Sequence, residues 1–346
     1  MDEIVMNRNA ASYQADIAHI AHEPLPWTDL EGKRVLVTGA TGLIGSCLVD
    51  ALLAATKTTE VFICGRDESK ARRCFGSIGN SQRLHFFIHD LNNPLEEKGA
   101  FHYILHIGGN AYPKVFSEDP VGTSRGAVNA VDNLLSYGYQ HGLERFLLLS
   151  SGEVYGEGNG MSFSEDDSGF VDTMNARSCY PTGKRAAENL AASYAKQYGL
   201  DIVVARPCHI YGPTFTQSDN RAYAQFLRNV LNGCDIILKS DGKQQRSYCY
   251  VADCVSALFF ILLRGSSGKA YNIADNDSFI SIKTLAEMIA KVGGKKVVTE
   301  VPKEEEKMGY SILKSTKLDV TRICELGWKP WTTLQEGIEK ALNALK

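Results

Sequence analysis

The sequence predicts an α/β protein with a Rossmann-like doubly wound parallel sheet followed by a smaller C-terminal α/β subdomain. Three observations support this fold class. Short apolar, β-branched runs alternate with helical stretches up to Arg206. A glycine-rich turn, Gly39–Gly45, joins the first strand to the first long helix. The chain has 346 residues, of which 44% are hydrophobic, and so can bury one large core and a smaller one.

The individual elements follow from the position of the apolar runs. Residues 1–30 precede the first strand and are expected to form a surface arm, with one short helix over 14–21. Uninterrupted apolar runs are typical of parallel strands covered on both faces. Such strands are expected over 34–38, 60–64, 83–89, 102–107, 145–150 and 201–206. Helices are expected over 43–55, 123–138 and 180–198, the last of which Gly199 ends.

Composition argues against several classes of function. The formal net charge is −3, so the chain lacks the basic field that nucleic acid requires. Its longest apolar run, 254–263, is half of a membrane span and predicts a buried helix. Asp2 and Glu3 do not fit a signal peptide, and none of the nine cysteines forms a Cys-x-x-Cys pair. We therefore expect a cytoplasmic protein with reduced thiols, without a metal and without a membrane or nucleic-acid partner.

The glycine turn indicates a dinucleotide site. Small residues between a strand and a helix let the backbone approach a pyrophosphate, which the helix N-terminus attracts. A plain tight turn is the alternative interpretation, and the flanking strand and helix argue against it. Expected cofactor-binding residues are Gly39, Thr41, Gly42, Leu43, Ile44 and Gly45, with Asp90 and Leu91 after the third strand.

The end of the second strand bears on the choice between NAD and NADP. Gly65 stands where an acidic residue would bind the ribose hydroxyls of NAD, and Arg66 follows it. An arginine can hold a 2′-phosphate with two hydrogen bonds, and Lys70 could add charge. Alternatively, Arg66 is merely exposed and Asp67 serves the ribose. We expect NADP or NAD as the cofactor, with NADP slightly favoured.

Tyr180 and Lys184 are the best candidates for redox chemistry. They lie one helical turn apart, so both side chains share a face. A phenol is a poor base at neutral pH, and a neighbouring ammonium is expected to lower its pKa. The pair would then remove a hydroxyl proton while a nicotinamide takes hydride from the same carbon. An ordinary surface Tyr and Lys are the alternative.

Ser151 and Glu153 follow the fifth strand, at the end of the sheet where active sites of this fold lie. The Ser151 hydroxyl could hydrogen-bond the reacting oxygen beside Tyr180. A buried Glu153 could act as a base on carbon. A structural glutamate is the alternative for Glu153.

The chain resembles the extended short-chain dehydrogenase/reductase superfamily, in its nucleotide-sugar epimerase/dehydratase branch. The resemblance covers about residues 33–342. It is carried by six blocks in order: Thr-Gly-Ala-Thr-Gly-Leu-Ile-Gly, Ser-Ser-Gly-Glu-Val-Tyr-Gly, Tyr-Pro-Thr-Gly-Lys, Arg-Pro-Cys-His-Ile-Tyr-Gly-Pro, Arg-Ser-Tyr-Cys-Tyr-Val-Ala-Asp and Leu-Gly-Trp-Lys-Pro.

The resemblance implies that a bound nicotinamide oxidises C4 of a nucleotide-diphosphate sugar to a ketone, which then reacts further. It places Ser151, Tyr180 and Lys184 at the catalytic positions and Arg246 on the substrate diphosphate. It also implies a homodimer formed through two helices of each subunit. We therefore expect residues 31–212 to bind NAD(P) and carry the catalytic residues. Residues 213–346 are then mainly a substrate-binding subdomain.

The departures from each activity of the family leave the reaction open. Glu153 resembles the glutamate of 4,6-dehydratases and UDP-glucuronate decarboxylases, but Gly152 replaces the acid of the dehydratases. The stretch 314–319 lacks the arginine that grips the substrate carboxylate in the decarboxylases. Arg221 lies in a decarboxylase-like segment and could meet an anionic sugar. His209 replaces a frequent asparagine and is a further substrate-binding candidate.

Three interpretations are therefore carried forward. The first is a 4-epimerase or 4,6-dehydratase that acts through a 4-keto sugar. The second is an enzyme like the UDP-glucuronate decarboxylases. The third, of another class, is a protein that senses NADP redox state without turnover, against which the retained Tyr180 and Lys184 argue.

Overall fold

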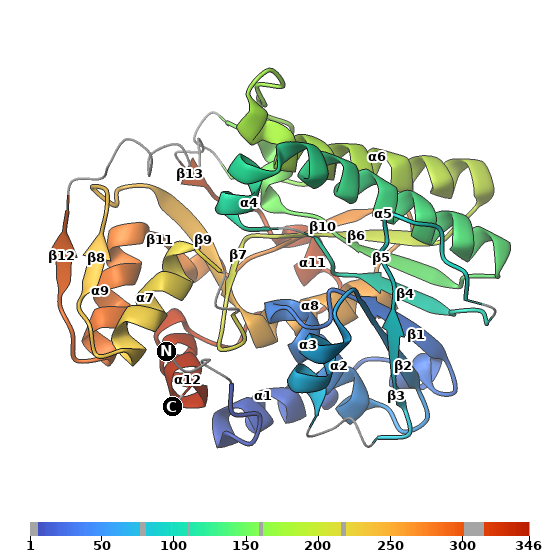
Figure 1. The fold of residues 1–346 in the computed structure, drawn as a ribbon, viewed down its shortest axis with the longest axis horizontal. Coiled ribbons are helices and arrows are strands. Elements are labelled where there is room, and N and C mark those ends of the chain that lie inside the picture. The colour runs from blue at the N-terminus through green and yellow to red at the C-terminus, as the bar shows by residue number, and fades with distance from the viewer. Residues whose placement is uncertain are drawn as a thin grey trace.

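The computed structural model describes residues 6–76, 81–97, 99–109, 111–158, 162–215, 219–300 and 315–345. It has two parts, as Figure 1 shows: a large parallel sheet covered by helices on both faces, and a smaller lobe of short strands and helices on the left of the view. Residue 314, the first of the stretch 314–319, lies outside the described residues.

The large sheet has seven strands, and each neighbouring pair is parallel. The strand order is β10-β6-β5-β4-β1-β2-β3. From the centre, the chain adds β1, β2 and β3 toward one edge of the sheet and β4, β5, β6 and β10 toward the other, and this confirms the predicted doubly wound fold. Six strands match the predicted runs closely, whereas β10 comes from the region assigned to the smaller subdomain. The bounds are β1 (Arg34–Thr38), β2 (Glu60–Gly65), β3 (Leu84–Ile88), β4 (Tyr103–His106), β5 (Arg145–Leu149), β6 (Ile202–Pro207) and β10 (Ala270–Ile273).

Local sequence signals explain where the helices of the large sheet begin and end. α5 begins before the predicted residue 123 because Pro120 opens it and the Asp119 carboxylate accepts from the Gly122 N–H. α6 ends at Gly199, whose φ of 72° is left-handed. The bounds are α2 (Leu43–Ala55), α3 (Glu68–Phe75), α4 (Pro113–Glu118), α5 (Pro120–Gln140), α6 (Cys179–Tyr198) and α8 (Val251–Arg264).

The smaller lobe is built around strand β9 (Gln245–Tyr250). It pairs with β7 (His209–Tyr211), β11 (Phe279–Ser281) and β13 (Ser315–Thr316), while β8 (Ile236–Leu238) pairs with β12 (Val297–Thr299). Helices α7 (Ala222–Leu231), α9 (Ile282–Val292), α11 (Thr321–Cys324) and α12 (Leu334–Ala344) complete the C-terminal third. Short 3-10 turns are η1 (Trp27–Leu30), η2 (Gly152–Tyr155), η3 (Ala176–Ser178) and η4 (Asn276–Ser278).

The N-terminal segment differs from the surface arm expected from the sequence. Helix α1 (Ala11–Ala21) packs against α2, α8 and α12, and it buries Tyr13 and Ile20 in the main core (Figure 1). The Tyr13 hydroxyl donates to Asp50 of α2 at 2.6 Å, and Lys340 of α12 donates to Asp16 at 2.6 Å. The first helix therefore joins the cofactor-side helix α2 to the C-terminal helix α12.

Helix α8 lies at the centre of the main core, as the apolar run over 254–263 predicts. Its residues from Val251 to Leu262 are all buried. Because apolar residues surround the whole helix, its sequence shows no polar face. Within the described ranges, we find no helix that combines the length and the apolar character needed to cross a bilayer.

Candidate active site

The glycine turn lies at the point where the strand order reverses. Gly39 follows β1 with a φ of 66°, and a Cβ atom there would lie 2.6 Å from the Cα of Gly108, which follows β4. A Cβ atom on Gly45 would lie 2.3 Å from the carbonyl oxygen of Gly39. Only glycine permits such close backbone packing. The backbone of the turn therefore lies close to both strands, at the carboxyl end of the sheet.

This turn fits the pyrophosphate of a dinucleotide. Gly42 is the N-cap of α2, and among the described residues no side-chain cap hydrogen bond forms at this end of the helix. These donors and the positive end of the helix dipole are thus available to an anion. Thr41 lies in the turn itself, and Leu43 and Ile44 open the helix. The residues present therefore suit the cofactor expected from the sequence.

A buried hydrogen-bond chain holds the other side of this crevice. The Thr38 hydroxyl accepts from the Gly108 N–H at 3.0 Å and lies 2.8 Å from Nδ1 of His106. Burial and the nearby charge of Lys184 lower the pKa of His106 to about 3. The imidazole is therefore neutral at neutral pH. These hydrogen bonds fix the loop after β4 next to the glycine turn.

The end of β2 presents its charged residues to solvent. Arg66 and Lys70 are exposed. The Asp67 carboxylate accepts from the Lys70 N–H at 2.9 Å and so caps α3. After β3, the Asp90 carboxylate accepts from Asn92, while the carbonyl oxygen of the following residue, Leu91, accepts from Asn133.

Tyr180 and Lys184 are both buried in the first turns of α6. The Lys184 ammonium donates to the carbonyl oxygen of Leu149, at the end of β5, at 2.7 Å. Burial lowers the pKa of Lys184 from its ordinary value of 10.5 to about 8. The lysine thus lies under the carboxyl end of the sheet, beside the loop that carries Gly109.

The pKa of Tyr180 moves in the direction opposite to the one expected from the sequence. Burial and the negative charge of Glu153 raise it to about 12, while a hydrogen bond with Ser151 acts in the opposite direction. The ring stacks on Phe116 of α4, with centroids 4.5 Å apart and 21° between the planes. Apolar surroundings disfavour the charged phenolate, and this outweighs the positive charges of Arg221 and Arg177, which act to lower the pKa.

Ser151 and Glu153 belong to the short turn η2 that follows β5. The Ser151 hydroxyl accepts from the Glu153 N–H at 3.1 Å and caps the turn. The Glu153 carboxylate pairs with Arg177 of η3, whose two terminal nitrogens each lie 3.5 Å from Oε2. The sequence analysis missed Arg177. Its guanidinium also lies over the Phe116 ring, 4.6 Å from the centroid.

The smaller lobe contributes three further predicted residues. His209 of β7 lies beside β9, and burial together with the charges of Arg246 and Arg221 lowers its pKa to about 3. Arg246 of β9 is buried and lies close enough to Glu153 for their charges to interact. Arg221 precedes α7, and its charge acts on Tyr180. Arg246 and Arg221 therefore lie within electrostatic reach of the centre formed by η2 and α6, and His209 lies within electrostatic reach of both arginines.

Arg221 is held by a buried carboxylate. Its guanidinium donates to both oxygens of Asp219, at 2.6 to 3.2 Å, and Asp219 is 1% exposed. The hydroxyl of Tyr223 lies 2.9 Å from the same guanidinium. This arrangement fixes the direction of Arg221 and compensates most of its charge locally.

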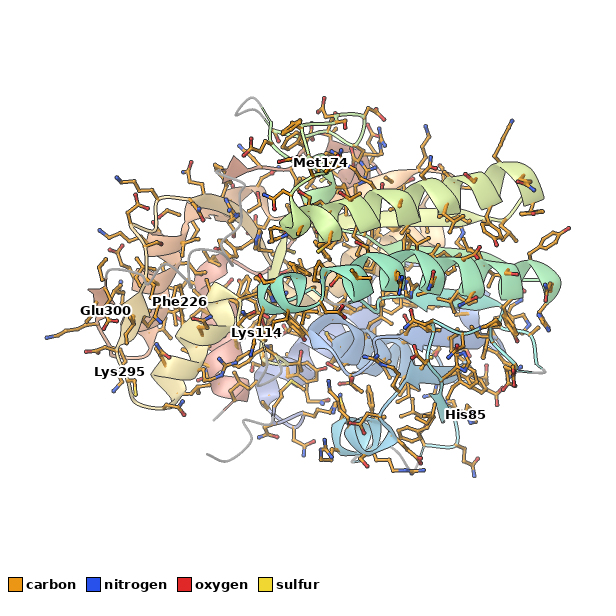
Figure 2. The ribbon with its side chains drawn as sticks, turned by 45° about the horizontal axis from the view of Figure 1, so that its top comes forward. His85, Lys114, Met174, Phe226, Lys295 and Glu300 are labelled. Atoms are coloured by element: carbon orange, nitrogen blue, oxygen red, sulfur yellow. The ribbon has the colours of Figure 1, made fainter. Side chains whose placement is uncertain are left out.

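In Figure 2, Lys114 labels α4, which lies at the ends of α5 and α6 that point toward the smaller lobe. Phe226 labels α7 of that lobe. Charge interactions join Tyr180, Glu153, Arg221 and Arg246 in this centre, whereas Arg66 follows β2 and Lys70 lies in α3. Within the described ranges, no group of three or more His, Cys, Asp or Glu side chains could hold a metal ion.

Three residues near the centre carried little signal in the sequence. Phe116 and His106 are one aromatic and one histidine among many, and their contacts join elements distant in the chain. Arg177 lies three residues before Tyr180, a spacing that brings side chains to one side of a helix. Because η3 precedes the helix proper, this signal was weak.

A comparison with protein families agrees with the dinucleotide site described above. Residues 35–274 match the model of the NAD dependent epimerase/dehydratase family. Among curated proteins, the chain is 32% identical over 308 residues to UDP-glucuronic acid decarboxylase 6 of Arabidopsis thaliana, covering 88% of this chain and 86% of the relative. It is 28% identical over 322 residues to UDP-glucuronic acid decarboxylase 1 of Xenopus tropicalis, covering 91% and 73%.

Solved structures show the same architecture. The dTDP-glucose 4,6-dehydratase of Streptomyces venezuelae, with NAD bound, superposes with a TM-score of 0.80 at 23% identity, covering 90% of this chain and 96% of that one. The UDP-glucose 4-epimerase of Thermus thermophilus, in complex with NAD, gives a TM-score of 0.76 at 26% identity, covering 90% and 98%.

Proposed function

Because the chain belongs to the NAD dependent epimerase/dehydratase family, we propose that it is an enzyme that oxidises C4 of a nucleotide-linked sugar and acts on the resulting 4-keto sugar. One observation carries this proposal. Tyr180, which a hydrogen bond joins to Ser151, and Lys184 lie buried at the carboxyl end of β5. The glycine turn that suits a dinucleotide lies at the same end of the sheet.

In the proposed reaction, Tyr180 removes the proton of the C4 hydroxyl, and Ser151 orients the reacting oxygen by a hydrogen bond. A bound nicotinamide would accept the hydride and would add a positive charge to the site. That charge and the ammonium of Lys184 would both favour the phenolate, against the burial that raises the pKa of Tyr180. Lys184, fixed by the Leu149 carbonyl, remains directed toward this region.

Arg246 is proposed to bind the diphosphate of the substrate. It is 2% exposed, and burial lowers its pKa, so an anionic ligand would restore favourable electrostatics. Its guanidinium also suits two phosphate oxygens. Arg221 and His209 would line the adjoining sugar site, because both lie within electrostatic reach of Arg246 or Tyr180.

Dehydration is the least supported second step. In the 4,6-dehydratases, an acid stands at the position of Gly152. Even a Cβ atom there would lie 3.3 Å from the carbonyl oxygen of Pro207 and 3.4 Å from Leu318. A side chain at this position requires its neighbours to shift by a few tenths of an ångström, whereas glycine requires no shift. Simple epimerisation, which needs no such acid, agrees better with this packing.

Decarboxylation of a nucleotide-linked hexuronate is the second candidate. It is favoured by the curated relatives, which are named UDP-glucuronic acid decarboxylases, and by the positive charges of Arg177, Arg221 and Arg246 around Glu153. A carboxylate next to C5 is β to a C4 ketone, so oxidation at C4 makes loss of carbon dioxide favourable. The cations would hold that carboxylate before it leaves.

A substrate panel tests this function. Purified protein is incubated with UDP-, dTDP-, GDP- and CDP-linked hexoses and hexuronates, and products are read by mass spectrometry. Loss of carbon dioxide, loss of water and unchanged mass with a new stereoisomer separate the three activities. If no nucleotide sugar reacts and the bound cofactor is never reduced, the proposed function is wrong, and a redox-sensing role is favoured.

Together with this function, we propose a cofactor preference, an oligomeric state and a cellular location. The exposed Arg66 supports NADP, and Asp67 is already engaged at the N-terminus of α3. Tyr139 of α5 and Tyr198 of α6 are exposed and pack on each other, which supports a homodimer formed through these two helices. All nine cysteines are free thiols, consistent with a cytoplasmic enzyme that supplies sugars for polysaccharide synthesis.

A further inference from the structure

Arg177 occupies an unusual position beside the candidate acid–base groups. Its side chain is only 10% exposed, and the guanidinium stacks on Phe116, whose ring also stacks on Tyr180. Phe116 itself is 2% exposed. One buried ring therefore contacts both the cation and the phenol, and any shift of Arg177 would be felt at Tyr180.

The guanidinium has only one charged partner among the described residues. Both terminal nitrogens lie 3.5 Å from the same oxygen of Glu153, longer than the 2.7–2.9 Å that is usual for such pairs. The Nε–H of Arg177 is buried and has no hydrogen-bond partner in the described part of the chain. A buried arginine held this loosely is not explained by stability alone, because its desolvation is poorly compensated.

The charges that face Tyr180 come from several elements. Glu153 of η2 raises the pKa of the phenol, whereas Arg177 of η3 and Arg221 before α7 lower it. Ser151 donates or accepts a hydrogen bond there, and Cys179 precedes the phenol in α6. Lys184 lies one turn along α6, and Arg246 of β9 faces Glu153. Because Asp219 already binds Arg221, Arg177 is the cation that directly compensates Glu153.

We propose that Arg177 is a positioning residue: stacked on Phe116, it holds the Glu153 carboxylate beside Tyr180 and compensates its charge there. Without it, the negative charge of Glu153 would act on the phenol uncompensated. Arg177 therefore couples the first step at Tyr180 to the later carbon-acid step at Glu153. This inference rests on the proposed function for its catalytic meaning, but the coupling exists without substrate.

A titration of Tyr180 tests the coupling directly and needs no turnover. The protein, loaded with NAD or NADP, is labelled with ¹³C at the tyrosine Cζ, and the Tyr180 signal is assigned by its loss in Tyr180→Phe. The fraction of phenolate in spectra from about pH 7 to about pH 11, compared at each pH, then ranks the apparent pKa of the phenol among the variants. Arg177→Gln should raise that value by about one unit, and Glu153→Gln should lower it.

The double variant distinguishes coupling from general damage. Removing both charges in Glu153→Gln/Arg177→Gln should return the titration of Tyr180 to within a few tenths of a unit of the wild type. Arg177→Lys, which keeps the charge, should behave nearly as the wild type. As a matched control, Arg185→Gln removes another arginine of the same region, which binds the carbonyls of Val154, Tyr155 and Gly169 but no carboxylate. It should lower stability without shifting the titration.

Enzyme kinetics give the second readout. With a substrate found in the panel, cofactor reduction by Arg177→Gln should be about tenfold slower at neutral pH and recover as the pH rises by about one unit. The inference is wrong if Arg177→Gln leaves the titration of Tyr180 unchanged, or if the apparent pKa of Tyr180 in the double variant stays as high as in Arg177→Gln. Failure of the proposed function has a different signature: the titration responds as described, but no nucleotide sugar reduces the cofactor.

Discussion

The ammonium of Lys184 donates to the carbonyl oxygen of Leu149 at 2.7 Å and thereby ties helix α6 to the carboxyl end of β5. Lys184 is 8% exposed, and burial lowers its pKa to about 8. A lysine in this state is poorly suited to stabilising the fold, since the buried charge is costly. The contact is explained by the need to direct a cation toward the site.

This burial predicts a stability effect for Lys184→Met. In the wild type, the pKa of Lys184 rises on unfolding from about 8 to 10.5. Between these values the unfolded chain binds more protons, so raising the pH stabilises the folded wild type, by about 3 kcal/mol in total. The variant should lack this gain while losing activity. Urea unfolding at several pH values between about 7 and about 10 measures it, and parallel curves for both proteins would contradict the prediction.

Tyr180→Phe should abolish turnover while leaving substrate binding nearly unchanged. The variant removes the hydroxyl that is expected to take the C4 proton, and it keeps the ring that stacks on Phe116. A loss of at least about a hundredfold in the rate of cofactor reduction is expected. Stopped-flow absorbance gives the rate, and calorimetry gives substrate affinity. An unchanged rate would remove Tyr180 from the catalytic role.

Glu153→Gln should separate the first step from the second. Oxidation at C4 does not use the carboxylate, so the cofactor should still be reduced. A later step that removes a proton from carbon should stop, because an amide is no base. Mass spectrometry and cofactor absorbance on the same sample distinguish the steps. Normal formation of product would mean that Glu153 is structural and would favour simple epimerisation.

Gly45→Ala should damage the dinucleotide site. The added methyl group would lie 2.3 Å from the carbonyl oxygen of Gly39, so the turn must move. A stability loss of about 1–3 kcal/mol is expected, together with weaker cofactor binding. Gly126→Ala in α5 is the matched control, because nothing lies within 4 Å of its added Cβ. It should stabilise the helix by about 0.5–1 kcal/mol. Equal melting temperatures for the two variants would contradict the assignment.

Arg66→Ala should weaken NADP binding by about tenfold to a hundredfold and NAD binding far less, since only NADP carries the 2′-phosphate. Fluorescence titration of both cofactors measures the difference. Arg72→Ala is the control, because Arg72 lies on the adjoining helix α3 and pairs with Glu68. If Arg66→Ala lost affinity for NAD and NADP equally, Arg66 would not select NADP, and NAD would become the expected cofactor.

Much of the fold was predictable because its signals are local. Six parallel strands appear as apolar runs, and Gly45 must be glycine because of its close approach to Gly39, a neighbour in the sequence. The strand β10 was missed because its four residues are too short to stand out, and only pairing with β6 defines it. Helix α1 was expected on the surface, since its burial depends on Asp50 and Lys340, distant in the chain.

The sequence by itself determined the family, the dinucleotide turn and the four residues of the proposed chemistry, because each is written in a short motif with a fixed spacing. The tertiary structure alone decided their electrostatics. It buried Tyr180 against Phe116 and raised its pKa, placed Arg177 on Glu153 and directed Arg221 and Arg246 toward them. Charge interactions depend on distance and burial, which arise only when separate elements pack together.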